Sequence, residues 1–252
     1  MRQAIATPVP ASDDAPRPWQ TWEGHALVVG TGGIGKALLE GLPIHAPSLR
    51  LWSAGRTEGD LRVDLADPAS LERLGQISRE ELSPLRLVIC AAGLLHGADL
   101  QPEKRLSQVN TKALQQSFAV NAWGPLLLAQ ALETALPREA PSHFASLSAR
   151  VGSIGDNRLG GWYAYRGAKA AQNQLLRTLA LEWRRRLPLA CVTLLHPGTT
   201  ATELSAPFRS SVAADRLFSP ERAASQLLAV LERQTAETSG SFLAWDGQPI
   251  PW

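Results

Sequence analysis

Short apolar runs and longer stretches with helical spacing alternate along this chain from about residue 24 onward. The apolar runs are bounded by turn residues and have the length of strands, and the stretches between them have apolar positions three and four residues apart. The expected strands are Ala26–Val29, Leu49–Ser53, Leu85–Cys90, Ser142–Leu147, Leu189–Leu195 and Ser241–Trp245. The expected helices are Lys36–Gly41, Ser70–Leu74, Leu114–Leu136, Tyr163–Arg186 and Pro220–Arg233. This alternation predicts a parallel sheet covered by helices on both faces.

A glycine-rich turn follows the first expected strand. Ala26–Val29 leads into Gly30-Thr31-Gly32-Gly33-Ile34-Gly35, and a helical pattern begins directly afterwards. Strand, G-x-G-x-x-G turn and helix together predict a dinucleotide site. Gly30 permits the tight turn, Gly32 lets the backbone approach a pyrophosphate, and Gly35 lets helix and strand pack closely. The first turn of the helix offers N–H groups to the phosphates. The alternative is a glycine-rich turn that holds no ligand.

These patterns predict one Rossmann-type α/β domain over residues 24–252, a doubly wound parallel sheet with helices on both faces. The chain of 252 residues is long enough to bury a sizeable core. Residues 1–23 are rich in Pro, Ala, Ser and Asp, which predicts a flexible N-terminal extension. Trp19 and Trp22 suggest that the end of this extension docks on the domain.

Charge and cysteine content narrow the function classes. The formal net charge is +2, and the one tight basic run, Arg184–Arg186, ends a helical pattern where it complements the helix dipole. We therefore expect no nucleic-acid partner. Cys90 and Cys191 lie in expected strands, which predicts buried free thiols and no metal site. The absence of a long apolar run and of a leader-like start predicts a cytoplasmic protein with no membrane association.

Tyr165 and Lys169 are the candidate chemistry of the long helix Tyr163–Arg186. Residues four apart share one helix face, so the ammonium is expected to lie beside the phenol. At an effective dielectric of about 20, a unit charge about 4 Å away is worth roughly 4 kcal/mol, or about three pKa units. The pair therefore predicts a phenol whose pKa is lowered toward working pH, suited to acid–base chemistry at a carbonyl or alcohol. The alternative is a half-buried ring beside a solvated charge.

Taken together, these motifs resemble those of the short-chain dehydrogenase/reductase superfamily, and more narrowly its C-factor-like branch. The resemblance covers nearly everything from His25 to Trp252 and is strongest at Ser148–Asn157, at Gly160–Tyr165 and at the ending Asp246–Trp252. Further segments that resemble superfamily motifs, in the expected order, are Cys90-Ala91-Ala92-Gly93, Asn121-Ala122-Trp123-Gly124 and Pro197-Gly198-Thr199-Thr200-Ala201-Thr202.

The resemblance implies roles for individual residues. Tyr165 would exchange a proton with the substrate oxygen, while Lys169 would lower the pKa of Tyr165 and hold the nicotinamide ribose. Asn121 would anchor a water or backbone link toward Lys169, or alternatively satisfy a local break in its own helix. A serine, for which we select Ser148, would hold the substrate oxygen. The residues implied to contact the cofactor are Gly30, Thr31, Gly32, Gly33, Ile34, Gly35, Arg56, Asp64, Leu65, Ala91, Ala92, Gly93, Tyr165, Lys169, Pro197, Gly198, Thr200 and Thr202.

The chain departs from the family pattern at three places. Its glycine turn is shorter than the usual T-G-x-x-x-G-x-G, which puts the contacts to the adenosine end in doubt. Ala149 stands where the catalytic serine is expected, which leaves Ser148 and Ser153 as the nearby hydroxyls. Ser148 precedes Ala149 on an extended strand end, which predicts that its side chain faces the other way. Cys90 replaces the polar residue that begins the N-x-A-G segment.

The segment after the second strand bears on cofactor choice. A carboxylate there suits the ribose hydroxyl of NAD, whereas an Arg suits the 2′-phosphate of NADP. Gly55 occupies the acidic position and Arg56 follows it, which favours NADP, although Glu58 keeps NAD open. Asp64 with Leu65 resembles the pair beside the adenine, or alternatively Asp64 caps the next turn.

The sequence thus predicts an NADP-dependent oxidoreductase, a carbonyl reductase or alcohol dehydrogenase acting on a small molecule. A homodimer or homotetramer is expected through Leu114–Leu136 and Tyr163–Arg186, where family members commonly pair and whose apolar residues exceed one buried face. One alternative is a cofactor-binding signalling or regulatory protein with little turnover, which the missing serine favours. Another is an epimerase or dehydratase, which the short segment from Ala201 to Phe218 disfavours.

Overall fold

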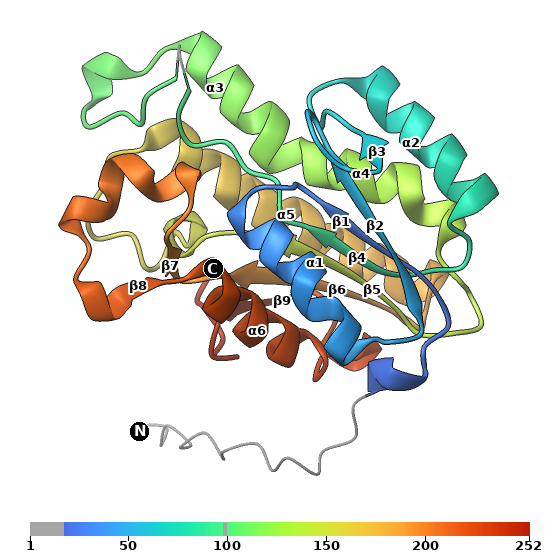
Figure 1. Cartoon of the computed structure of the whole chain (residues 1–252). Helices are drawn as coiled ribbons and strands as arrows, with labels where there is room; N and C mark the ends of the chain where they lie inside the picture. Colours follow the sequence, from blue (N-terminus) through green and yellow to red (C-terminus); the bar gives the residue numbers. More distant parts are fainter. Residues whose placement is uncertain (1–17, 98–99) are drawn as a thin grey trace, which may run out of the picture.

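A seven-stranded parallel sheet forms the centre of the molecule (Figure 1). The computed structural model describes residues 18–97 and 100–252. The sheet order is β3-β2-β1-β4-β5-β6-β9, and a separate pair joins β7 and β8. The bounds are β1 Gly24–Val29, β2 Leu49–Gly55, β3 Leu61–Arg62, β4 Leu85–Cys90, β5 Ser142–Leu147, β6 Ala190–His196, β7 Thr199–Thr200, β8 Leu217–Phe218 and β9 Ser241–Ala244. The predicted doubly wound α/β fold is confirmed.

Helices cover both faces of the sheet, and each face has its own apolar core (Figure 1). On one face, α1 and α6 pack with the sheet around residues such as Leu38 and Leu227. On the other, α2, α4 and α5 pack around residues such as Leu74, Leu128 and Leu176. The bounds are α1 Gly33–His45, α2 Pro68–Glu81, α3 Thr111–Phe118, α4 Gly124–Leu132, α5 Tyr163–Arg186 and α6 Pro220–Leu231.

The single helix predicted over Leu114–Leu136 is wrong, because a π-helical segment, Ala119–Trp123, separates α3 from α4. Pro125 is the physical cause. It has no N–H to donate to the carbonyl of Asn121 four residues earlier, and its ring crowds that carbonyl in a regular α-helix. The N–H of Gly124 instead bonds to the carbonyl of Ala119, five residues back. The break sets Asn121 into a wider turn, a geometry that often occurs at functional sites.

The start of the described chain packs against the body. A short 3-10 helix, Pro18–Thr21, precedes β1, and both Trp19 and Trp22 are buried in the core on the α1–α6 face. The guanidinium of Arg86 lies 4.6 Å from the centre of the Trp22 ring. Residues 18–22 therefore belong to the packed body, whereas the predicted flexibility of residues 1–17 falls outside the described residues.

No helix within residues 18–97 and 100–252 is both long and apolar enough to cross a membrane.

Candidate active site

The glycine turn after β1 brings backbone atoms closer than side chains would allow. Gly30 has φ +104°, and a Cβ there would lie 2.5 Å from the backbone nitrogen of Ala92. A Cβ on Gly35 would lie 1.7 Å from the carbonyl oxygen of Gly30, so only glycine fits where α1 packs on the turn. A Cβ on Gly32, by contrast, would meet no described atom within 4 Å. The turn is closed toward the protein and open at Gly32.

The open side of this turn suits an anion. Gly32 is the N-cap of α1 and supplies no side chain to bond the N–H groups of the first turn. No acidic residue stands in that turn. Unpaired N–H groups and the positive end of the helix dipole therefore face the space beside Gly32, which is where a pyrophosphate would fit. These features suit the phosphates of a dinucleotide, and we call the turn Gly30–Gly35 the candidate cofactor cradle.

Two threonines border the cradle. The hydroxyl oxygen of Thr31 would lie 2.7 Å from a Cβ on Gly55, so Thr31 packs against the end of β2. The methyl of Thr202 would lie 2.8 Å from a Cβ on Gly33. This contact brings the segment after β6 onto the glycine turn, although the two are far apart in the sequence. Ile34 packs at the edge of the adjoining apolar core.

The end of β4 forms the next part of the site. Ala91 donates its N–H to the carbonyl of Val29 at 2.7 Å, which joins Ala91, Ala92 and Gly93 to the glycine turn. Asn121 is fully buried, and its side chain holds Leu94, the residue after Gly93, by two hydrogen bonds. Its Oδ1 accepts the N–H of Leu94 at 2.9 Å, and its Nδ2 donates to the carbonyl of Leu94 at 2.6 Å. Asn121 therefore lies in a helix break, as one alternative held, but its side chain fixes the β4 loop.

Tyr165 and Lys169 are both buried on the same face of α5, and Lys169 is only 2% exposed. The Lys169 Nζ lies 5.8 Å from the centre of the Tyr165 ring. It donates to the carbonyl of Leu147 at 2.8 Å and to Gln172 Oε1 at 2.9 Å. An ammonium has three protons, so these bonds leave one for a further acceptor. The ammonium thus sits at the carboxyl end of β5, the sheet edge where this fold class binds ligands.

Burial dominates the electrostatics of this pair. It raises the pKa of Tyr165 above its usual range, because the phenolate would lose its hydration. The predicted downward shift is therefore wrong for the chain by itself: the ammonium bonds to Leu147 and Gln172 rather than to the phenol. Burial lowers the pKa of Lys169 to about 8, which leaves it mostly protonated at neutral pH. At that pH the site holds a neutral phenol and an ammonium.

The serines near the end of β5 differ in what their hydroxyls do. Ser148 donates its proton to Asn173 Oδ1 at 2.6 Å, so this proton is already committed within the protein. Ser153 accepts the N–H of Asp156 at 3.1 Å, and no described residue accepts the Ser153 proton. Ala149, which has no hydroxyl, is partly exposed. The role selected for Ser148 stays a prediction, and Ser153 is the nearby hydroxyl whose proton is unassigned.

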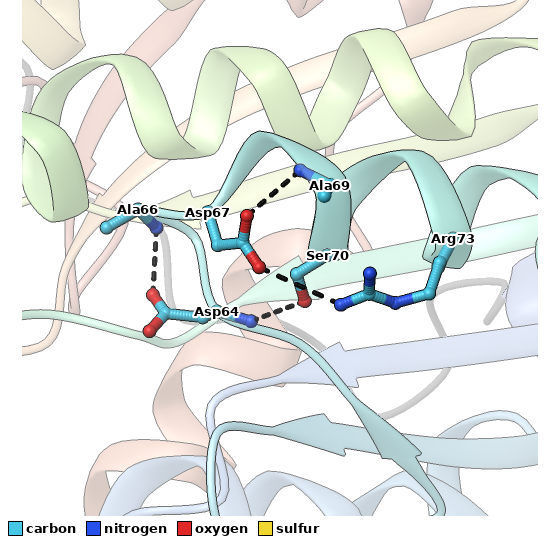
Figure 2. Close-up of polar contacts among 6 residues, drawn as sticks. All are labelled: Asp64, Ala66, Asp67, Ala69, Ser70 and Arg73. Carbon is cyan, nitrogen blue, oxygen red and sulfur yellow. Dashed lines mark hydrogen bonds and ion pairs between the residues drawn. The ribbon is translucent and has the colours of Figure 1, made fainter.

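The residues expected at the adenosine end lie on the β2 side. Asp64 Oδ1 accepts the N–H of Ala66 at 2.9 Å, which closes a local turn, while Asp67 caps α2 through the N–H of Ala69 (Figure 2). Leu65 is buried in the core. The contacts of Asp64 therefore match the alternative in which its carboxylate caps a local turn. Figure 2 also shows Arg73 reaching Asp67, at 3.7 Å.

The loop after β2 leaves one basic group open to solvent. Arg56 is exposed, and its side chain bonds to no described residue. Glu58 is exposed as well. Asp60, by contrast, accepts the N–H and the hydroxyl of Ser53 at 2.8 and 2.7 Å, and these bonds lower the pKa of its carboxyl. No local sequence pattern indicates that Asp60 accepts these bonds from Ser53.

The segment after β6 turns sharply and then lies over the site. Gly198 has φ +74° and packs under Phe218 and Trp245. Thr200 is buried in β7, and its hydroxyl donates to the carbonyl of Pro197 at 3.4 Å. Thr202 begins the 3-10 segment Glu203–Ser211. Pro197, Gly198, Thr200 and Thr202 thus form one continuous wall that reaches the glycine turn.

Two residues that the sequence reasoning did not select complete the site. Gln172 is fully buried, and its Nε2 donates to Ser146 Oγ at 2.8 Å while its Oε1 holds Lys169. Its position three residues after Lys169 could have indicated the contact. Glu103 is 3% exposed and accepts the N–H of Ala164 at 3.2 Å, at the start of α5. No sequence signal links two residues 61 positions apart.

Known proteins resemble this chain in sequence and in fold. A family model described as short chain dehydrogenase matches residues 53–213. The C-signal protein of Myxococcus xanthus is 33% identical over 148 residues, which cover 58% of this chain and 83% of that protein. The 1-hydroxy-2-glutathionyl-2-methyl-3-butene dehydrogenase of Rhodococcus sp. (strain AD45) is 31% identical over 192 residues, 75% of this chain and 78% of that protein. Among solved structures, the NADPH-bound carbonyl reductase from chicken fatty liver has a TM-score of 0.78 at 21% identity, covering 92% of this chain and 100% of that one.

Proposed function

The chain belongs to the short-chain dehydrogenase/reductase family, and from this premise we propose that it is an NADP-dependent carbonyl reductase with Tyr165 as its acid. The observation that carries the proposal is the placement of the buried Tyr165–Lys169 pair. Lys169 is held at the end of β5, which pairs with β4, and the end of β4 contacts Gly30 in the glycine turn. Proton donor and cofactor cradle therefore share one edge of the sheet.

The bound nicotinamide would supply or accept the hydride. The residues of this chain supply the binding, the orientation and the proton. The first turn of α1 and the open side of Gly32 would hold the pyrophosphate, and the unassigned proton of Lys169 would bond to a ribose hydroxyl. Asn121 fixes the β4 loop beside them.

A neutral Tyr165 suits the role of proton donor. Burial keeps its phenol neutral at physiological pH, so the hydroxyl is ready to donate a proton to a carbonyl oxygen that receives hydride. We therefore propose that Tyr165 is the proton donor when a carbonyl is reduced near neutral pH.

The test is NADPH and NADH oxidation, followed by absorbance, with a panel of aldehydes, ketones and quinones. We expect turnover that needs a carbonyl substrate and is lost in Tyr165→Phe. The preference should be for NADPH, because the exposed Arg56 can form charge-assisted bonds to a 2′-phosphate. A chain that binds neither cofactor in calorimetry would contradict the proposal.

A second candidate is a cofactor-binding regulatory protein with little turnover. The observation that favours it is the commitment of the Ser148 proton to Asn173, together with Ala149 at the expected serine position. Tight cofactor binding without turnover of any carbonyl in the panel would favour this candidate over the reductase.

We also propose that the protein forms a homodimer or homotetramer through the α4 and α5 surfaces. Trp123, next to α4, and Leu181 on α5 remain 41% and 45% exposed. Large exposed apolar side chains on neighbouring helices suit a second copy of the chain. Light scattering that returns a monomer mass at micromolar concentration would contradict this.

A further inference from the structure

Four aromatic rings from three separate segments, Tyr165 among them, contact one another in series. The Trp162 and Tyr165 ring centres are 6.2 Å apart at an interplanar angle of 71°. Trp162 also contacts Phe208, at 4.9 Å, and Phe208 contacts His96, at 6.2 Å. We call these four residues the aromatic wall. Trp162 and Tyr165 come from the start of α5, Phe208 from the segment after β6, and His96 from the loop after β4.

Trp162 occupies a backbone conformation that disfavours its side chain. Its φ of +52° and ψ of +44° lie in the left-handed region, and no other non-glycine residue of the described ranges has a positive φ. Glycine or Asn adopts this conformation at lower cost. A tryptophan at such a position persists only where the surroundings hold it, and such strain is typical of functional sites. The backbone conformation of this turn therefore does not explain why a tryptophan stands at position 162.

Glu103 holds this strained residue in place. Its carbonyl oxygen accepts the N–H of Trp162 at 2.5 Å, and its buried carboxylate accepts the N–H of Ala164 at 3.2 Å. The two bonds clamp the backbone on both sides of Tyr163. The position of the indole beside Tyr165 is thus set by contacts from outside α5.

The remaining parts of the wall are tied to the β4 loop. The His96 Nε2 lies 3.1 Å from the carbonyl oxygen of Glu203, which joins that loop to the segment carrying Phe208. Leu204 in the same segment would lie 3.5 Å from a Cβ on Gly93, and Asn121 Oδ1 would lie at the same distance from it. The wall therefore borders the region between Asn121 and Tyr165, where the proposed function places the reacting carbonyl.

We propose that Trp162 is a specificity-determining residue and that the substrate is a carbonyl compound carrying a planar aromatic group. This inference rests on the proposed function, because it assigns the substrate class of the same site. Aromatic rings contact one another edge-to-face or offset more favourably than they contact saturated rings of equal size. The Trp162 ring beside the phenol, with the Phe208 ring packed against it, would therefore select a flat, apolar ring attached to the carbonyl.

The test compares benzaldehyde with cyclohexanecarboxaldehyde, which have the same carbon framework but differ in planarity. The variant is Trp162→Leu, which keeps an apolar side chain. The control is Leu159→Ala, at a residue 92% exposed near the same turn. The two aldehydes differ in intrinsic reactivity, so we compare one ratio between proteins: kcat/KM for benzaldehyde divided by kcat/KM for cyclohexanecarboxaldehyde. The decisive quantity is the change in this ratio from the unmodified protein to the variant. We expect Trp162→Leu to lower this ratio about tenfold and Leu159→Ala to leave it unchanged. An equal loss for both aldehydes would overturn the inference.

Binding measurements separate this inference from the proposed function. Calorimetry with the unreactive benzamide and cyclohexanecarboxamide, in the presence of NADPH, needs no turnover. We expect benzamide to bind more tightly and Trp162→Leu to remove the difference. If no carbonyl is reduced but this difference is found, the reductase proposal fails and the aromatic wall stands. Should Trp162→Leu fail to fold, as judged by circular dichroism, Phe208→Leu serves in its place, and equal binding of the two amides by the unmodified protein overturns the inference.

Discussion

Replacing Gly32 with valine should remove cofactor binding while leaving the fold intact. A Cβ at this position would meet no described atom within 4 Å, and the backbone, with φ −73° and ψ −174°, is extended and open to any residue. Loss of glycine flexibility in the unfolded chain stabilises by about 0.4–1 kcal/mol, and a poorer N-cap costs a similar amount, about 1 kcal/mol. The free energy of unfolding should therefore change by less than about 1 kcal/mol, or roughly 2–4 °C in Tm.

The two methyl groups of a valine at position 32 would occupy the space that a bound pyrophosphate needs. Overpacking of a well-fitted contact typically costs about 1–3 kcal/mol, and each 1.4 kcal/mol is about tenfold in Kd. We therefore expect NADPH and NADH to bind roughly 10- to 100-fold more weakly, or not measurably, in calorimetry.

Gly35→Ala is the matched comparison within the same turn. Its Cβ would lie 1.7 Å from the Gly30 carbonyl oxygen, so the backbone itself must shift. We expect a loss of about 3 kcal/mol or more in unfolding free energy, measured by urea denaturation. If Gly32→Val bound NADPH within twofold of the unmodified protein, or lost as much stability as Gly35→Ala, the open side of the turn would not be the cofactor cradle.

Three further predictions concern the site. Tyr165→Phe should lower kcat about 10²- to 10⁴-fold, with the cofactor Kd nearly unchanged. Undiminished NADPH oxidation by this variant, followed by absorbance, would contradict the role of Tyr165 as the acid. Lys169→Met should lower both turnover and cofactor affinity while stabilising the fold near pH 7, by up to about 3 kcal/mol before its bonds to Leu147 and Gln172 are subtracted. The pKa of Lys169 is about 8 in the folded protein and 10.5 in its usual state. Between pH 8 and pH 10.5 the folded chain therefore binds fewer protons than the unfolded chain, so the free energy of unfolding of the unmodified protein rises with pH over this range. The advantage of the Met variant in urea unfolding should therefore shrink from pH 7 to pH 10, and a constant difference would refute the shift. Arg56→Ala should reduce a preference for NADPH over NADH of about 10- to 100-fold, mainly by weakening NADPH, and less so in high salt; an unchanged ratio would make Arg56 an ordinary surface residue.

Local pattern was enough to predict the strands and the main helix of the site. β4, β5 and α5 have the bounds that the sequence predicts, because strands buried on both faces need continuous apolar runs and long helices show their spacing over many turns. The glycine turn was predicted for the same reason, since its spacing and its flanking elements are adjacent in the chain. β3, β7 and β8 were missed because strands of two residues carry no periodicity and form only through their partners.

By itself, then, the sequence determined the order of the long strands and most of the helices, the family and the candidate residues Tyr165, Lys169 and Asn121. Tertiary structure decided how they are held. The pKa of Tyr165 moves upward because burial outweighs a lysine whose protons are bonded elsewhere, a balance that spacing along one helix does not reveal. Glu103 reaches the start of α5 across 61 positions of sequence. Contacts of this kind depend on which segments the folded sheet brings together, and no local pattern records them.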